Sequence, residues 1–173
     1  MRTLSHVEGR DWLAHEGIPI NLDNPYDQPR ELTAYFRIDH DSGAKTVLAR
    51  SIAFDLFEGT ETLFAVTENG VWPSSEYEFV FQKYRAGLGV SRPLRESDFH
   101  LFDKEETDSL GGAIALSLYF VWGFLVSDLR GDIIVAASHD EYLQCWADDS
   151  QALERVVALF LDLGLERLYK SQS

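Results

Sequence analysis

Three apolar segments in the C-terminal half of the chain, joined by tight turns, constrain the fold more than any other feature. They are Phe124–Ser127, Ile133–Ala137 and Tyr142–Trp146. Leu129-Arg130-Gly131-Asp132 separates the first two segments, and a turn at His139-Asp140 separates the second two. Parallel neighbours need a crossover of a dozen or more residues, whereas antiparallel neighbours need only a turn. The sequence therefore predicts an antiparallel meander of three strands.

Two further strands complete the predicted sheet. Leu32–Asp39 alternates and is rich in aromatic residues, and Leu63–Thr67 is a short apolar run before the turn Asn69-Gly70. The predicted fold class is α+β, with about five strands in a mixed or antiparallel sheet and helices packed on the sheet. Residues 1–30 are expected to form an irregular N-terminal segment with one short helix near Asp11–Glu16. Residues 31–173 are expected to form a single α+β domain.

Apolar residues at helical spacing predict the main helices. One helix ends near Phe57, and the last is expected to begin at Asp148, which caps it together with Gln151. The clearest helix follows Ser75, which forms a capping box with Glu78. One face of this helix carries Tyr77, Val80, Phe81 and Tyr84.

One segment has almost the length of a membrane span. Leu110–Val126 contains about 17 residues without a formal charge, which is close to the lower limit for crossing a bilayer. Glycines interrupt the segment, and no cluster of Lys or Arg flanks it. The sequence therefore predicts a buried helix over Leu110–Val121 that leads into a buried strand, and no membrane association.

Cysteine content and the first residues favour the cytoplasm. The single cysteine, Cys145, excludes an internal disulfide and is compatible with a reducing compartment. The first residues contain no apolar stretch that would serve as a signal peptide.

The charge balance points to the kind of partner. The chain has 29 acidic and 15 basic residues and a formal net charge of −14. Such a field repels nucleic acid phosphates and anionic lipid, so neither is expected as a partner, and it favours a basic protein. One interpretation is that the acidic surface only maintains solubility. The other is that the chain binds a basic partner, such as a nuclease domain, in the place of its nucleic acid.

His139, Asp140 and Glu141 are the catalytic candidates, because three ionisable residues crowd one turn between strands. A histidine beside carboxylates can accept a proton near neutral pH. Successive residues of a strand point to opposite faces, so at most two of the three side chains can converge. The alternative is a polar turn in which Asp140 bonds its own backbone. The five histidines are scattered and form no zinc signature, so no metal or cofactor is expected.

A second polar cluster, Trp72-Pro73-Ser74-Ser75-Glu76, opens a helix and supplies candidates for binding. Trp, Tyr and Arg make strong anchors at protein interfaces. The rim of a binding surface could therefore consist of Trp72, Ser75, Glu76, Tyr84 and Arg85. The alternative is that Trp72 is a hydrophobic staple that packs onto Phe79 or the sheet.

Four segments together resemble a family of small uncharacterised bacterial proteins with WPSSE and SHDE motifs. They are Val71-Trp72-Pro73-Ser74-Ser75-Glu76, Tyr84-Arg85, His100-Leu101-Phe102 and Ser138-His139-Asp140-Glu141. The resemblance covers about residues 32–143. It implies a bacterial cytoplasmic protein and supplies no activity.

Two classes of function follow from these observations. The first is a non-enzymatic acidic protein-binding module, of the immunity or antitoxin kind, that engages a basic partner. The second is a small hydrolase or isomerase in which His139 is the base and Asp140 or Glu141 orients it. Because each polar cluster follows a strand, both clusters are expected at the same end of the sheet. The oligomeric state does not follow from the sequence.

Overall fold

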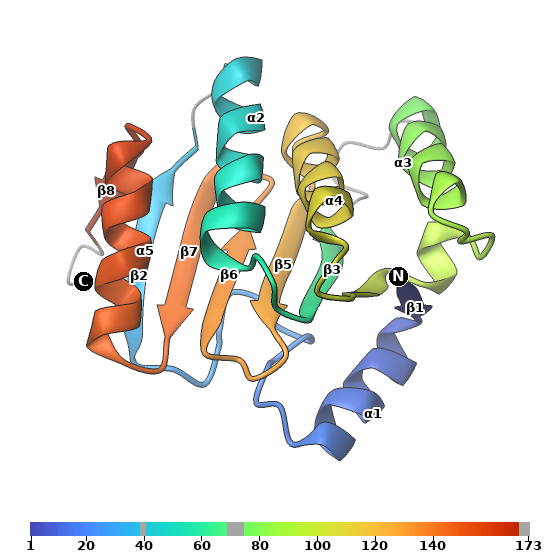
Figure 1. The fold of residues 1–173 in the computed structure, drawn as a ribbon, viewed down its shortest axis with the longest axis horizontal. Helices are drawn as coiled ribbons and strands as arrows, with labels where there is room; N and C mark the ends of the chain where they lie inside the picture. Colours follow the sequence, from blue (N-terminus) through green and yellow to red (C-terminus); the bar gives the residue numbers. More distant parts are fainter. Residues whose placement is uncertain (39–40, 69–74, 170–173) are drawn as a thin grey trace.

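One antiparallel sheet organises the fold, and its strands follow the order β1-β4-β3-β5-β6-β7-β2-β8 (Figure 1). The computed structural model describes residues 1–38, 41–68 and 75–169, with only the backbone described for Ser75. In chain order the strands are β1 (Arg2–Leu4), β2 (Leu32–Arg37), β3 (Thr62–Glu68), β4 (Phe99–Phe102), β5 (Gly123–Asp128), β6 (Ile133–Ala137), β7 (Tyr142–Ala147) and β8 (Glu166–Leu168).

The α+β class is confirmed, and the predicted meander corresponds to β5, β6 and β7, which pair in antiparallel register. The prediction of about five strands was too low, because the sheet has eight strands among the described residues. The additional strands β1, β4 and β8 have only three or four residues each. Segments this short cannot display the alternation by which strands are recognised in a sequence.

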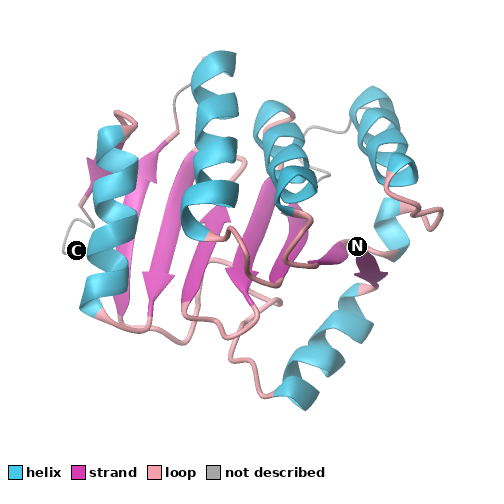
Figure 2. Cartoon of the chain, in the orientation of Figure 1, coloured by secondary structure: helices cyan, strands magenta, loops and turns pink. Residues whose placement is uncertain are grey.

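Helices cover both faces of the sheet (Figure 2). One face carries α2 (Ser42–Ser51), its π-helical continuation η1 (Ile52–Leu56), α4 (Thr107–Tyr119) and α5 (Ser150–Asp162). The other face is covered by α1 (His6–Glu16) and the loop over residues 17–31. Beside α4 lies α3 (Ser75–Gly87), which a 3₁₀ turn, η2 (Leu94–Glu96), connects to β4 (Figure 1).

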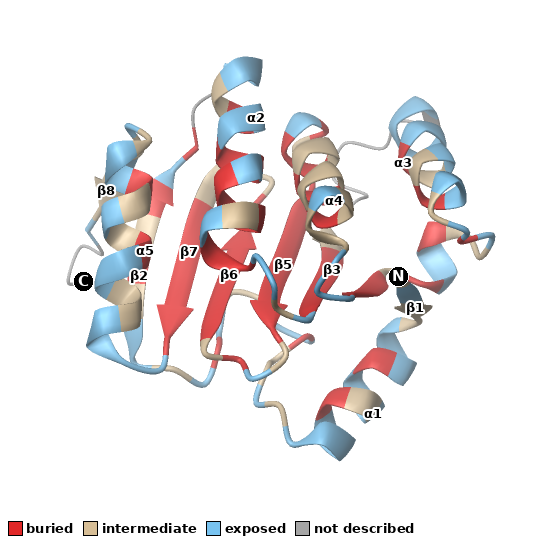
Figure 3. Ribbon diagram, in the orientation of Figure 1, coloured by how far each residue is buried: buried red, intermediate tan, exposed pale blue. Residues whose placement is uncertain are grey.

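The central strands are buried on both faces, as Figure 3 shows. Every residue of β5 and β6 is buried. Strands covered on both sides read as continuous apolar runs instead of alternating patterns. This explains why the meander was the strongest signal in the sequence. No helix in the described part of the chain is both long enough and apolar enough to span a bilayer.

The N-terminal segment is more regular than the sequence predicted. β1 pairs with β4, and α1 extends over eleven residues where only a short helix was expected. A capping box between Ser5 and Glu8 begins α1, and Gly17 ends it with a left-handed backbone at φ 70°. The helix has a weak apolar stripe, because only Leu13 and Gly9 are buried, so periodicity alone did not reveal its length.

The cap of α5 differs from the prediction by one residue. Asp149, and not Asp148, accepts a hydrogen bond from the Ala152 amide, at 2.8 Å. Asp148 instead forms an ion pair with Arg30. Two adjacent aspartates cannot be distinguished as caps by spacing, and a tertiary contact to the N-terminal loop decides between them.

Candidate functional site

The antiparallel sheet has two ends, and ionisable side chains gather at both. β3 and β6 each run antiparallel to β5, so both strands finish at the same end. We call it the histidine end, because His139 follows β6 there. β5 and β7 finish at the opposite end, which we call the acidic end (Figure 1).

A three-residue hydrogen-bonded cluster occupies the histidine end. His139 Nδ1 lies 2.7 Å from Glu68 Oε2, and the Tyr26 hydroxyl donates to the same oxygen at 2.8 Å. The Tyr26 oxygen also lies 3.1 Å from the Ala137 carbonyl oxygen. A single carboxylate oxygen therefore joins the N-terminal loop, β3 and the turn after β6.

Two features of the sheet allow Glu68 to reach His139. A register irregularity between Val66 and Glu68 interrupts the pairing of β3 with β5, and such bulges re-aim the side chains beside them. Gly123, opposite Glu68 on β5, leaves room for the carboxylate. A Cβ atom at Gly123 would lie 2.6 Å from Glu68 Oε2 and 2.8 Å from Glu68 Cβ. Sequence analysis missed Glu68, and its only signal was an acidic residue at the end of an apolar strand.

The hydrogen bonds set the protonation behaviour of this cluster. The hydrogen bond with Glu68 raises the pKa of His139, more than its partial burial lowers it. Burial acts to raise the pKa of Glu68, but hydrogen bonds from His139 and Tyr26 outweigh it, so the pKa is lowered. Burial, together with Glu68, raises the pKa of the Tyr26 hydroxyl. The cluster therefore favours a carboxylate, an imidazolium and a neutral phenol.

The three catalytic candidates do not converge on one point. Asp140 Oδ1 lies 3.5 Å from His139 Nε2, while the Asp140 amide donates to Ser138 Oγ at 3.1 Å. Glu141 has a left-handed backbone with φ 59° and its carboxylate lies 2.8 Å from Lys45 Nζ. Glu68 is thus the carboxylate that orients His139, and Glu141 is engaged elsewhere.

Of the five residues expected at a binding rim, the structure describes the side chains of Glu76, Tyr84 and Arg85, which differ in exposure. Trp72, Pro73 and Ser74 lie outside the described residues, as does the Ser75 side chain, so the capping box and the shared position of the two clusters stay predictions. Glu76 is exposed on α3. Arg85, in contrast, is fully buried and donates to the Ser97 carbonyl at 2.8 Å. It therefore does not belong to an exposed rim.

The physical reason for the burial of Arg85 is its position four residues after Phe81, on the inward face of α3. Burial lowers the pKa of its guanidinium to about 10. Tyr84, one residue earlier, is partly buried and donates to the Ser109 carbonyl of α4. Both residues hold α3 to its neighbours.

Other reactive groups are not assembled for chemistry. Cys145 is fully buried, and burial raises the pKa of its thiol, which disfavours a nucleophilic thiolate. Among the described residues, no group of three His, Cys, Asp or Glu side chains could hold a metal ion.

The acidic end contains a groove that sequence analysis did not predict. It has a volume of about 910 Å³ and lies between η1, the β5–β6 turn and the start of α5. Two guanidinium groups line this acidic groove, from Arg130 and Arg155. Six carboxylates also line it: Asp55, Glu58, Asp128, Asp132, Asp148 and Asp149. Apolar side chains, including Phe54 and Ile133, complete its wall.

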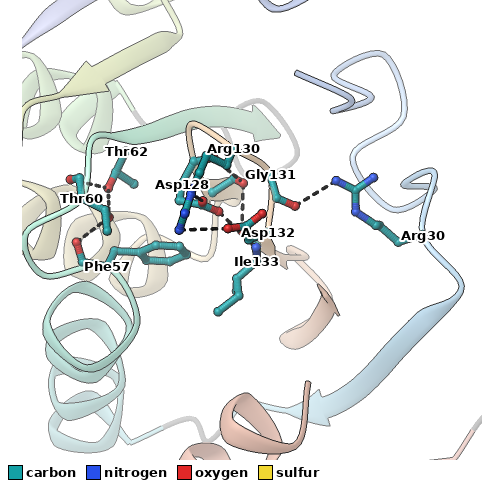
Figure 4. Close-up of polar contacts among 10 residues, drawn as sticks. Arg30, Phe57, Thr60, Thr62, Asp128, Arg130, Gly131, Asp132 and Ile133 are labelled. Carbon is teal, nitrogen blue, oxygen red and sulfur yellow. Dashed lines mark hydrogen bonds and ion pairs between the residues drawn. The ribbon is translucent and has the colours of Figure 1, made fainter. Parts of the chain in front are cut away.

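Some of the charged side chains in the groove form hydrogen bonds and ion pairs within the chain (Figure 4). Asp128 accepts a hydrogen bond from the Ile133 amide at 3.1 Å, and Arg130 reaches Asp132 at 2.9 Å. Within the described residues, no ion pair joins Asp55 or Glu58 to a cation, and both side chains are exposed. The groove therefore presents more negative charge than its own cations neutralise.

The acidic groove brings together segments from three parts of the chain. Asp55 and Glu58 follow α2, Asp132 lies in the β5–β6 turn, and Asp149 begins α5. The sequence shows each acidic residue, but only the tertiary structure places them around one groove.

Comparison with known proteins gives no relative: no family model matches the chain, and neither a curated protein nor a solved structure is similar to it.

Proposed function

We propose that this chain is a non-enzymatic binding module that engages a basic protein through the acidic groove. The observation that supports this proposal is the composition of the groove, where six carboxylates face two guanidinium groups. We further propose that the module belongs to the immunity or antitoxin kind and acts in the bacterial cytoplasm, where it blocks the nucleic-acid-binding surface of its partner.

The physical basis is electrostatic attraction combined with apolar contact. The net charge of −14 draws a basic partner toward the surface, and the concentration of carboxylates determines where that partner docks. The apolar residues of the groove, such as Phe54 and Ile133, supply contact area beneath the charged rim. Binding should weaken as salt rises, because salt screens exposed charges beyond about 10 Å at 0.1 M.

The test compares two variants with the same net charge. Asp55→Asn/Glu58→Gln removes two carboxylates from the groove, and Glu16→Gln/Glu105→Gln removes two exposed carboxylates elsewhere. The probe is a hexa-arginine peptide, titrated in calorimetry at two salt concentrations. We expect the groove variant to bind at least tenfold more weakly and the control variant to bind like the wild type. Equal weakening of both variants would contradict a groove-directed function.

The biological partner can then be identified by the same contrast. Wild-type protein and both variants would be used to capture proteins from the native bacterial cell. We expect a basic protein that is retained by the wild type and the control and lost by the groove variant. Its expression alone should be toxic, and coexpression of the wild-type chain should relieve the toxicity. A captured protein that is harmless alone would reject the immunity or antitoxin assignment.

A second candidate function rests on the histidine end. Glu68 fixes Nδ1 of His139, and Nε2, which lies 3.5 Å from Asp140 Oδ1, is the nitrogen that would transfer a proton in a small hydrolase or isomerase. None of the four main cavities formed by the described residues is lined by His139, which favours the binding module. His139→Ala and Asp55→Asn/Glu58→Gln distinguish the two functions. A cellular phenotype lost in the first variant and kept in the second would support the enzyme.

A further inference from the structure

A cavity of about 450 Å³ lies near the histidine end, between the start of α2 and the turn after α5. Its apolar wall consists of Ile38, Val47, Leu48, Leu163 and Leu165. Sites for small molecules have volumes of about 300–1,000 Å³ and mostly apolar walls with a few polar groups. The cavity fits this description in size and in lining, and we call it the apolar cavity.

The charged side chains around the apolar cavity neutralise one another. Arg37 lies 3.8 Å from Glu166, and both residues line the cavity. Lys45 also lines it, and its ammonium lies 2.8 Å from the carboxylate of Glu141. Two ion pairs therefore account for the charged residues of the described lining. A charged ligand would lose its hydration here without gaining an unpaired counter-charge, so the cavity favours an uncharged molecule.

A smaller cavity adjoins the apolar cavity and shares Ile38 and Lys45 with it. Its volume of about 10 Å³ is close to the room that one oxygen atom of the size of water needs. Trp122 lines it and is 3% exposed, and Trp122 Nε1 has no hydrogen-bond partner among the described residues. A buried N–H group is costly when it lacks an acceptor, so this donor favours an oxygen atom of a ligand.

The backbone around the smaller cavity is strained. Among the described residues, only two that are not glycine have a positive φ, namely Val121 at 56° and Glu141 at 59°. Both line the smaller cavity. A left-handed backbone is rare for a β-branched residue, and such strain is concentrated at ligand-binding positions. The strain thus occurs beside the same space as the unpartnered indole N–H.

From these observations we propose that the two cavities bind one uncharged molecule with an aliphatic chain and a carbonyl oxygen, such as a medium-chain ketone. The carbonyl oxygen occupies the smaller cavity and accepts a hydrogen bond from Trp122 Nε1. The aliphatic chain lies in the apolar cavity against Val47, Leu163 and Leu165. The two cavities share no lining residue with the acidic groove, so this proposal and the proposed function can fail independently.

The probe is 2-octanone, an uncharged ketone. Octanoate and octylamine are the chemical controls, because they have chains of the same length and carry opposite charges. Binding is measured by calorimetry and by NMR shifts of the Val47, Leu163 and Leu165 methyl groups. We expect saturable binding of 2-octanone with shifts at these three residues, and binding at least tenfold weaker for both controls. Lack of saturable ketone binding, shifts confined to other residues, or equal binding of a charged analogue would overturn the proposal.

Two exposed valines provide a matched pair of variants. Val47→Asp places a carboxylate in the wall of the apolar cavity, and Val7→Asp places one on α1, where the valine is similarly exposed. Both substitutions should leave the protein folded, because these side chains are 53% and 56% exposed. We expect Val47→Asp to weaken 2-octanone binding at least tenfold and Val7→Asp to leave it unchanged. Equal affinities would contradict the site.

The hydrogen bond from the indole is tested on the wild type and on one variant. In the wild type, the NMR resonance of the Trp122 indole N–H should shift with 2-octanone and stay in place with octane, which has no acceptor. Trp122→Phe removes the donor and keeps an aromatic ring, and we expect it to weaken ketone binding about tenfold and octane binding little. An indole resonance that ignores the ketone, or an equal loss of affinity for both ligands in Trp122→Phe, would reject the proposed hydrogen bond.

Discussion

The two ends of the sheet use the same residue types for different purposes. At the histidine end Glu68 and Glu141 have close partners within the chain: Glu68 has His139 and Tyr26, and Glu141 has Lys45. At the acidic end, Asp55 and Glu58 share a groove with four more carboxylates and two guanidinium groups. The supply of nearby donors thus decides whether a carboxylate stabilises the fold or remains available to another molecule.

The cations at the two ends of the sheet also differ, in how far their side chains are buried. The Lys45 side chain at the histidine end is 9% exposed, whereas the Arg130 side chain at the acidic end is 77% exposed. Exposed ion pairs contribute about 0–1 kcal/mol, while breaking a buried pair costs several times more. Four experiments below compare how much the side chains at each end contribute to the free energy of unfolding, in order of decreasing expected effect.

The largest effect is expected from Lys45→Met. This change leaves Glu141 without its ammonium partner in a mostly buried position, and we expect the free energy of unfolding to fall by ~2–3 kcal/mol. Arg130→Ala, the control at the acidic end, should cost no more than about 1 kcal/mol. Urea unfolding measures both values. If both variants lost the same free energy of unfolding, ion pairs at the two ends would not differ in their contribution to stability.

Gly123→Ala should destabilise the histidine end by ~2 kcal/mol, because the new methyl group would overlap Glu68 and force it to move. Gly87, at the end of α3, is the matched control, since a Cβ there meets no atom within 4 Å. We expect Gly87→Ala to change the free energy of unfolding by less than about 0.5 kcal/mol. In Gly123→Ala, loss of the NMR signature of the His139–Glu68 hydrogen bond would confirm the cause.

His139→Gln should lower stability by about 1 kcal/mol, with a distinct pH dependence. The pKa of His139 is raised above 6.5, so its contribution is present below pH 6.5 and is lost as pH rises through the folded pKa. The pKa of Glu68 is lowered below 4.5, so its contribution is present above pH 4.5 and is lost in stronger acid. The difference in unfolding free energy between wild type and variant should therefore be greatest between pH 4.5 and 6.5. A difference that grows in alkali would contradict this assignment.

The smallest effect on stability is expected at the acidic groove. Asp55→Asn/Glu58→Gln should leave the free energy of unfolding within about 0.5 kcal/mol of the wild type, or raise it slightly, because like charges are removed. Thermal unfolding alongside Glu16→Gln/Glu105→Gln makes the comparison at constant net charge. A large loss of stability in the groove variant alone would show that these carboxylates serve the fold.

The sequence was sufficient where the physical signal is local. Apolar runs and tight turns predicted β5, β6 and β7, and helical spacing predicted α2, α3 and α5. The short strands β1, β4 and β8 were missed. Their extended conformation depends on pairing with strands distant in the sequence, and their own residues show no strand-like alternation.

The candidate sites depend on contacts between distant residues, which a single sequence does not reveal. His139 was recognised from its neighbours, but its partner Glu68 is 71 positions earlier in the chain. Arg85 resembled a surface anchor, although its guanidinium bonds the buried Ser97. The acidic groove lies between η1, the β5–β6 turn and the start of α5, which are far apart in the sequence.

The outer strands of the sheet have a consequence for the behaviour of the protein in a crowded cell. Among the described residues, the sheet terminates in β1 on one side and β8 on the other, and each has three residues. An open edge is a template on which other chains can add strands and begin fibrils, and its capacity grows with its length. Edges this short offer few backbone groups for recruitment. The long apolar strands β5, β6 and β7 are paired on both sides, so they present no open edge on which another chain could polymerise.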